Sequence, residues 1–133
     1  MRKLGLLVAA AGMLLVAVSP VLAHHAFSAE FDQAKPLKVS GEISKVEWVN
    51  PHAWIFIDVK DPDGKTTAWR FEMGAPNALL RAGWSRADIK PGTAVTISGF
   101  QARSGGPVGN AFQVRLPDGR DLFAASSLKD APK

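Results

Sequence analysis

The segment "WIFIDVKDPDGKTTAWRFEM", residues 54–73, decides the fold class because it encodes a β-hairpin. Residues 54–59 are apolar on both faces near their start, which is typical of a buried strand. The turn DPDG, residues 61–64, supplies a proline that presets one backbone dihedral and a glycine that tolerates the left-handed conformation. From Thr67 to Met73 apolar and polar residues alternate, and this alternation predicts a second strand with one apolar face.

Strand patterns on both sides of this hairpin indicate an all-β domain. Residues 37–48 alternate with one break, which is typical of a β-bulge. Residues 76–83 suit a short helix, and further strands are expected around 95–99 and 112–116, with a short sixth piece at 121–124. Three strands, a helix and two strands follow the order of an OB-fold. We therefore expect a five- to six-stranded OB-like Greek-key barrel with one short helix between strands 3 and 4.

Two glycines lie inside the expected strands. Gly41 and Gly99 fit the sharp coiling that such a small barrel needs. An open β-sandwich and an SH3-like barrel with a helical insertion are the competing architectures.

The first residues have the pattern of an export signal. Arg2 and Lys3 precede a 15-residue run without charge, residues 4–18, and small side chains precede a cleavage site after Ala23. The apolar run is shorter than the about 20 residues that a membrane span needs, and an uncleaved anchor is the alternative. We therefore expect a signal peptide at 1–23, a periplasmic location and no membrane span after cleavage.

The remaining 110 residues are long enough to form one domain. We expect an N-terminal arm at 24–36, the barrel at 37–125 and a flexible tail at 126–133. Without the two basic residues of the signal, 14 Lys and Arg face 12 Asp and Glu, which leaves a net charge of +2. Export and this near-neutral charge disfavour a nucleic-acid partner. The absence of cysteine excludes a disulfide framework and thiolate metal sites.

The chain has three histidines, and two of them directly follow the expected cleavage site. Cleavage would give His24 a free α-amine, which can chelate one metal ion together with the imidazole of the same residue. Nitrogen ligands suit Cu(II), which heads the affinity order of the divalent metals. A third nitrogen is expected from His25 or His52. The sequence therefore predicts a copper site at the mature N-terminus.

Two acidic residues near these histidines are candidates for the same site. Glu30 and Asp32 can supply an oxygen ligand or orient an imidazole. A different interpretation also exists, because an exposed histidine pair binds metal adventitiously and His52 can hydrogen-bond the turn at Asn50. The copper site is thus a hypothesis, without the ligand spacing of a zinc motif.

Aromatic residues offer a second kind of binding site. Trp48 and Trp54 flank the loop that carries His52, and Arg103 begins the glycine-rich segment 103–110. In OB-like barrels the loops between strands 1 and 2 and between strands 4 and 5 flank the usual ligand face. We expect Trp48, Trp54 and Arg103 to be candidate ligand-binding residues, with packing in the core as the alternative for the two tryptophans.

Four segments resemble one known family. They are "HHAFSAEFD" (24–32), "VEWVNPHAWIFIDVKD" (46–61), "PNALLRAGW" (76–84) and "LPDGRDLFAASS" (116–127). Together they resemble a family of small exported bacterial proteins of unknown function. The resemblance implies a periplasmic single-domain protein, and it implies neither an activity nor any site residue.

Two classes of function follow from these observations. The first is a small periplasmic binding protein that takes copper through the mature N-terminal histidine. The second is a metal-free OB-like module that binds a small ligand or a protein of the bacterial envelope. A copper redox enzyme built on the same histidines is a third interpretation. No serine–histidine–acid order indicates a hydrolase, and no phosphate loop is present. The sequence favours binding and does not separate a carrier from a catalyst.

Overall fold

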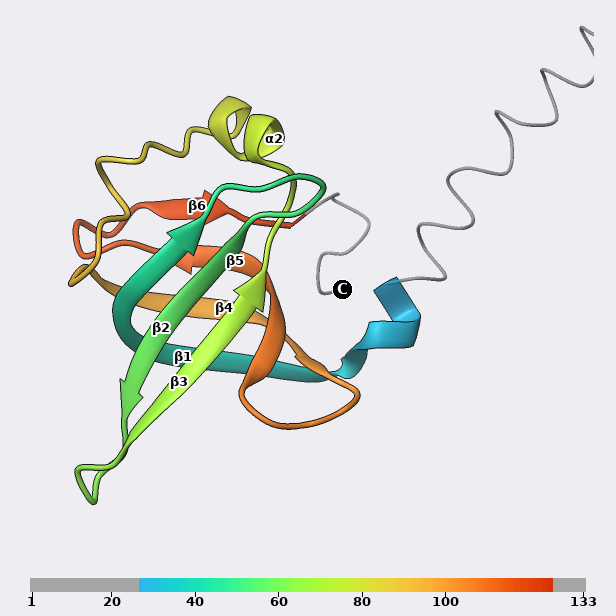
Figure 1. Cartoon of the computed structure of the whole chain (residues 1–133), viewed down its shortest axis with the longest axis vertical. Coiled ribbons are helices and arrows are strands. Elements are labelled where there is room, and N and C mark those ends of the chain that lie inside the picture. Colours follow the sequence, from blue (N-terminus) through green and yellow to red (C-terminus); the bar gives the residue numbers. More distant parts are fainter. Residues whose placement is uncertain (1–26, 126–133) are drawn as a thin grey trace, which may run out of the picture. The chain divides into compact units, whose positions relative to one another are not determined.

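The computed structural model describes residues 27–125, and the chain divides between Glu30 and Phe31 into two units. Residues 27–30 form a helical turn, and the unit that begins at Phe31 is described by itself. Its elements are labelled in Figure 1. They are β1 (Phe31–Glu47), β2 (Trp54–Lys60), β3 (Thr66–Glu72), α2 (Pro76–Arg81), β4 (Ala94–Ala102), β5 (Val108–Arg115) and β6 (Asp121–Phe123).

The strands close into a ring. In the sheet they follow the order β3-β2-β1-β4-β5-β6, and all of these neighbouring pairs are antiparallel. A parallel contact between β3 and β5 closes the ring through the residue pairs Arg70–Val108, Phe71–Gly109 and Glu72–Asn110. The described strands thus form a small all-β barrel with the strand order of an OB-fold, and the expected fold class is confirmed.

Strand β1 is long because it pairs with both of its neighbours. Its first part pairs with β4 and its last part with β2, with the expected bulge between Ile43 and Lys45. The strand also extends six residues further toward the N-terminus than the alternating pattern indicates. Phe31 explains the extension, because its side chain is buried and its backbone pairs with Ala102.

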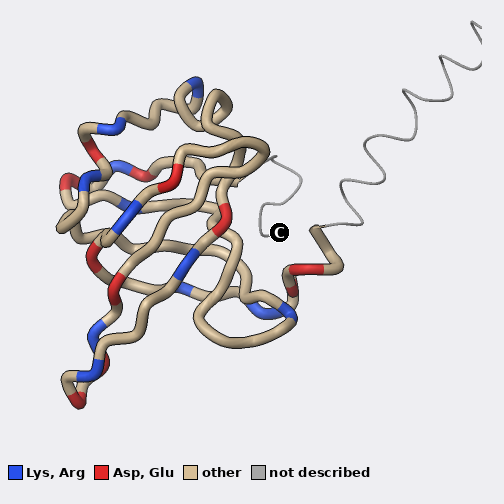
Figure 2. The backbone as a smooth tube through the Cα atoms, in the orientation of Figure 1, with Lys and Arg blue, Asp and Glu red and all other residues tan. Residues whose placement is uncertain are grey.

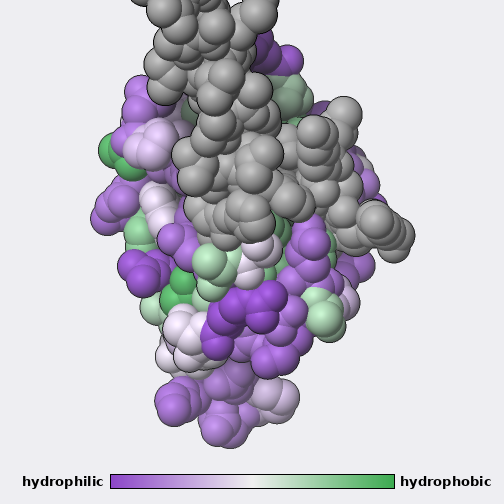
Figure 3. Space-filling model, turned by 90° about the vertical axis from the view of Figure 1, so that its right-hand side faces the viewer, coloured by the Kyte–Doolittle hydropathy of each residue, from purple (hydrophilic) through white to green (hydrophobic). Residues whose placement is uncertain are grey.

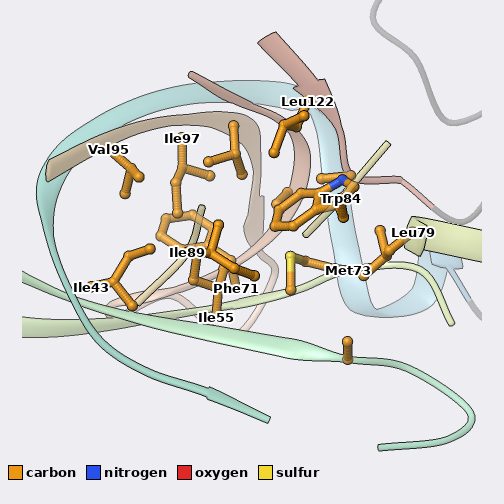
Figure 4. Packing of buried hydrophobic residues seen from close by; sticks show 14 of the residues in the cluster. Ile43, Ile55, Phe71, Met73, Leu79, Trp84, Ile89, Val95, Ile97 and Leu122 are labelled. Carbon is orange, nitrogen blue, oxygen red and sulfur yellow. The ribbon is translucent and has the colours of Figure 1, made fainter. Parts of the chain in front are cut away.

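The buried side chains of the core pack against one another between the strands (Figure 4). Inward-facing side chains of β2 and β3, such as Ile55 and Phe71, are completely buried. Leu79 of α2 and Trp84 close one part of this cluster, and the Trp84 indole Nε1 donates a hydrogen bond to the Phe123 carbonyl oxygen at 2.7 Å. A buried indole with a satisfied N–H fixes the segment after α2 to β6.

The surface of the barrel is polar and of mixed charge. Figure 2 shows basic and acidic residues interspersed along the strands. The β2–β3 hairpin lies at the bottom of Figure 3 and presents a largely hydrophilic surface. Within residues 27–125, the helices are too short or too polar to cross a membrane.

Two glycines allow the strands to approach each other closely. A Cβ atom built on Gly99 would lie 1.8 Å from the Asn110 carbonyl oxygen, and one built on Gly41 would lie 2.5 Å from that of Asp58. Gly99 also stands at the register shift between β4 and β5. The expected role of these glycines in coiling the barrel therefore has a steric cause.

We predict that Gly99→Ala lowers the free energy of unfolding by about 1–3 kcal/mol, because the added methyl group must push β5 away from β4. Urea denaturation followed by circular dichroism measures the change. Ser98→Ala, one residue earlier on the same strand, is the control and should stay within about 0.5 kcal/mol of the unmodified protein. Equal stability of both variants would contradict this account of the barrel.

Candidate functional site

A histidine and a glutamate form a close pair beside the start of β2. His52 lies in the β1–β2 loop (residues 48–53), and its Nδ1 atom is 2.6 Å from Oε1 of Glu72 at the end of β3. The Glu72 side chain is only 10% exposed, whereas that of His52 is 43% exposed. At this separation Oε1 can accept a proton from Nδ1, since an ionised carboxylate has no proton to donate. Nε2 is then the ring nitrogen left to bind a ligand.

The hairpin register explains why these two residues meet. Trp54 pairs with Glu72 across β2 and β3, so the carboxylate lies near the residues that precede β2. The pairing continues beyond the strands, because the Met73 amide donates to Ala53 O at 2.9 Å and the Ala53 amide donates to Gly74 O at 3.0 Å. These bonds fix the backbone next to His52. On the other side of β3, Glu72 pairs with Asn110 of β5.

Aromatic rings covered by cations adjoin the pair. Trp54 and Phe56 alternate with the fully buried Ile55 and therefore lie on the outer face of β2. The Arg70 guanidinium lies 5.5 Å from the Trp54 ring centroid, and the Lys45 ammonium lies 4.8 Å from that of Phe56. Such contacts stabilise by about 0.5–1 kcal/mol at exposed sites. The outer face of β2 thus offers two half-buried rings, each with a positive partner.

Trp48 has different neighbours from Trp54. Its ring makes an edge contact with Trp84 at a centroid distance of 6.4 Å, and Arg86 lies 4.9 Å above it. Trp48 packs against the buried apolar cluster, while Trp54 lies beneath Arg70. The two tryptophans that flank the β1–β2 loop therefore have different environments. Trp48 packs on the core, whereas Trp54 lies on the outer face of β2.

The β4–β5 loop (residues 103–107) borders the same strand as the β1–β2 loop. The Arg70 amide of β3 donates to the Pro107 carbonyl oxygen at 3.1 Å, while His52 contacts Glu72 two residues further along β3. Within this loop, Arg103 Nη1 lies 3.9 Å from Asp32 Oδ2. Both loops thus reach β3, as the comparison with OB-like barrels leads us to expect.

Asp32, one of the acidic candidates, has a different partner from the histidine. Asp32 faces Arg103 and accepts a hydrogen bond from the Ala34 amide at 3.1 Å, whereas the carboxylate beside His52 is that of Glu72. Glu30 is exposed on the helical turn at 27–30. The sequence pattern marks Glu72 only as a polar position of the third strand. The hairpin register, counted outward from the DPDG turn, is the signal that places it near His52.

His24 and His25 lie outside the described residues. Within residues 27–125, no group of three or more His, Asp or Glu side chains is arranged so that it could hold a metal ion by itself. His52 is the one histidine in that range. The described part of the chain therefore offers one imidazole, oriented by one carboxylate.

A groove of about 590 Å³ lies elsewhere on the barrel, where β1, β2, β3 and β4 meet the end of β5 and the residues that follow it. Its charged lining residues are Glu42, Asp58, Lys60 and Arg115. Arg115 is held by Asp121 through two hydrogen bonds of 2.7 Å, and these bonds lower the pKa of Asp121 to about 2. The lining contains neither a histidine nor an aromatic ring, and no sequence motif marks it.

Fold and site together define a small all-β barrel of the OB type, with an exposed histidine held by a nearly buried glutamate at the β1–β2 loop. The model of a family described as "Family of unknown function (DUF6152)" matches residues 11–111, and the chain belongs to this family. Membership of a family without known function agrees with the resemblance in the sequence. Neither the comparison with curated proteins nor that with solved structures found a match.

The different surroundings of the two tryptophans lead to a stability prediction. Trp48→Ala should lower the free energy of unfolding by about 2 kcal/mol or more, because it removes the ring contact with Trp84 and packing on the core. Trp54→Ala, on the outer face, should cost less than about 1 kcal/mol. Thermal and urea unfolding of both variants measures the difference, and a reversed order would contradict the packing described here.

Proposed function

We propose that this protein is a small periplasmic binding protein for copper, in which the α-amine and imidazole of His24 anchor a Cu(II) ion and His52 supplies a further ligand. The observation that supports the proposal best is the contact between His52 and Glu72. It leaves Nε2 of an accessible imidazole available, and it orients the ring through a carboxylate, as is common for histidines that bind metals.

The chemistry of the donors favours Cu(II). The sequence has no cysteine, so soft thiolate coordination is excluded, and the proposed ligands are an amine and imidazoles. The α-amine has an ordinary pKa of about 7.7–8 and yields its proton to a metal more readily than a lysine does. His25 is an additional nitrogen donor, and Glu30 and Asp32 remain candidates for an oxygen ligand or for orienting an imidazole of the N-terminal pair.

Export is part of the same proposal. The α-amine of His24 becomes available when a signal peptidase cuts after Ala23, and periplasmic signal peptides are cut at small residues of this kind. The proposal therefore links location to chemistry, because the same cleavage releases the protein and creates the metal ligand.

A second candidate function is metal-free binding of a small ligand or of an envelope protein. The observation in its favour is the outer face of β2, where Trp54 and Phe56 lie half-buried under Arg70 and Lys45. Aromatic rings beside cations suit a flat ligand that stacks on the ring. Arg103 on the neighbouring loop is a further candidate of this face. Under this alternative, removal of the histidines leaves binding unchanged.

The direct test compares the mature form that begins at His24 with a form that carries one extra residue in front. Titration with Cu(II), followed by visible and EPR spectra, should show about tenfold or more weaker binding for the extended form, because its α-amine is displaced from His24. Intact mass of the exported protein first establishes where the cut falls. Equal affinity of the two forms would exclude the N-terminal chelate.

A second comparison asks whether the barrel contributes a ligand. In the form that begins at His24, His52→Ala should weaken Cu(II) binding by about tenfold and reduce the nitrogen couplings seen by EPR. His25→Ala is the matched control for the loss of one imidazole next to the N-terminus. If His52→Ala binds like the unmodified protein and His25→Ala does not, the site is local to the N-terminus and the barrel has no part in it.

A further inference from the structure

We infer that Glu72 is a positioning residue for His52 and that it holds the imidazole in the tautomer that offers Nε2 to a Cu(II) ion. The metal-binding part of this inference rests on the proposed function. The tautomer part rests on the contact between Nδ1 and Oε1 alone, so the two can be tested separately.

The surroundings of the two side chains indicate which of them orients the other. Glu72 is 10% exposed and lies on a strand that is paired on both sides, with Trp54 of β2 and with Asn110 of β5. His52 is 43% exposed and lies in a loop. Because the carboxylate is fixed by its strand, the imidazole must adopt the orientation that the carboxylate accepts. Glu72 therefore positions His52, and not the reverse.

The contact also decides which nitrogen reacts. A neutral imidazole carries its proton on one nitrogen and its electron pair on the other. In the neutral ring, an Nδ1 proton held by Oε1 of Glu72 leaves the electron pair on Nε2, and the His52 side chain is 43% exposed. A carboxylate partner also makes the opposite nitrogen a stronger donor, and loss of such partners typically weakens metal binding 10- to 100-fold.

Burial of Glu72 gives a reason why the carboxylate and not a water molecule performs this role. A nearly buried carboxylate is costly without hydrogen-bond donors, and Nδ1 of His52 is one donor that offsets the cost. The pair is thereby held together even without a metal. The imidazole of His52 is thus already oriented in the metal-free protein, so metal binding does not carry the free-energy cost of ordering the ring.

The chain offers a matched control in Glu47. This residue of β1 pairs with Trp54, as Glu72 does from the other side, so the two carboxylates flank the same strand position. Glu47 forms an ion pair with Lys45 and is 39% exposed, whereas Glu72 contacts His52. Glu47→Gln removes one negative charge from the same part of the sheet without changing the partner of His52.

The test uses the mature chain that begins at His24, labelled with ¹⁵N. In the metal-free protein and in Glu47→Gln, NMR of the His52 ring should show the proton on Nδ1, and in Glu72→Gln a substantial fraction should move to Nε2. Cu(II) affinity should fall about 10- to 100-fold in Glu72→Gln and stay within about twofold of the unmodified protein in Glu47→Gln. Thermal unfolding confirms that both variants fold.

Two results would overturn the inference, and a third would remove its metal-binding part. The first is an NMR spectrum of the unmodified protein that shows the His52 proton on Nε2. This result needs no variant, so it decides the question even if Glu72→Gln fails to fold. The second is equal copper affinity of Glu72→Gln and Glu47→Gln. A mature protein that does not bind Cu(II) removes the proposed function and the metal role of Glu72 with it. A His52 proton on Nδ1 would in that case still confirm the orientation.

Discussion

The parallel contact between β3 and β5 is the constraint on which the barrel depends. It comprises three residue pairs, and it converts a row of antiparallel strands into a closed ring. Gly109 makes the contact sterically possible, since a Cβ atom there would lie 2.8 Å from the Phe100 carbonyl oxygen and 2.9 Å from the Phe71 ring. Phe71 of β3 is in turn completely buried. The pair that closes the ring therefore also contributes Phe71 to the core.

The same closure creates the candidate site. Glu72 belongs to the last of the three closing pairs, so β5 covers it from one side while β2 flanks it on the other. A carboxylate in such a place needs donors, and the β1–β2 loop brings the Nδ1 atom of His52 to it. The result is an imidazole whose orientation is set by the sheet rather than by the loop that carries it. This arrangement combines an orienting carboxylate on a paired strand with a partly exposed imidazole.

Much of the fold could be predicted because the alternation in residues 54–73 and the DPDG turn define the hairpin and its register. This register also predicts the position of Glu72, because pairing Lys60 with Thr66 places Trp54 opposite Glu72. The ion pair of Asp32 with Arg103 depends on the long-range register of β1 with β4, which no local pattern reveals. The core packing of Trp48 likewise depends on Trp84, which lies 36 residues later in the chain.

The central proposal is that the α-amine of His24 and Nε2 of His52 bind one copper ion, while Nδ1 of the same imidazole keeps its contact with Glu72. A crystal structure of the mature protein with Cu(II) tests it most directly. The account predicts one ion bound to both nitrogens, with the contact between His52 and Glu72 preserved. An ion held by His24 and His25 alone, with Nε2 of His52 in solvent, would contradict it.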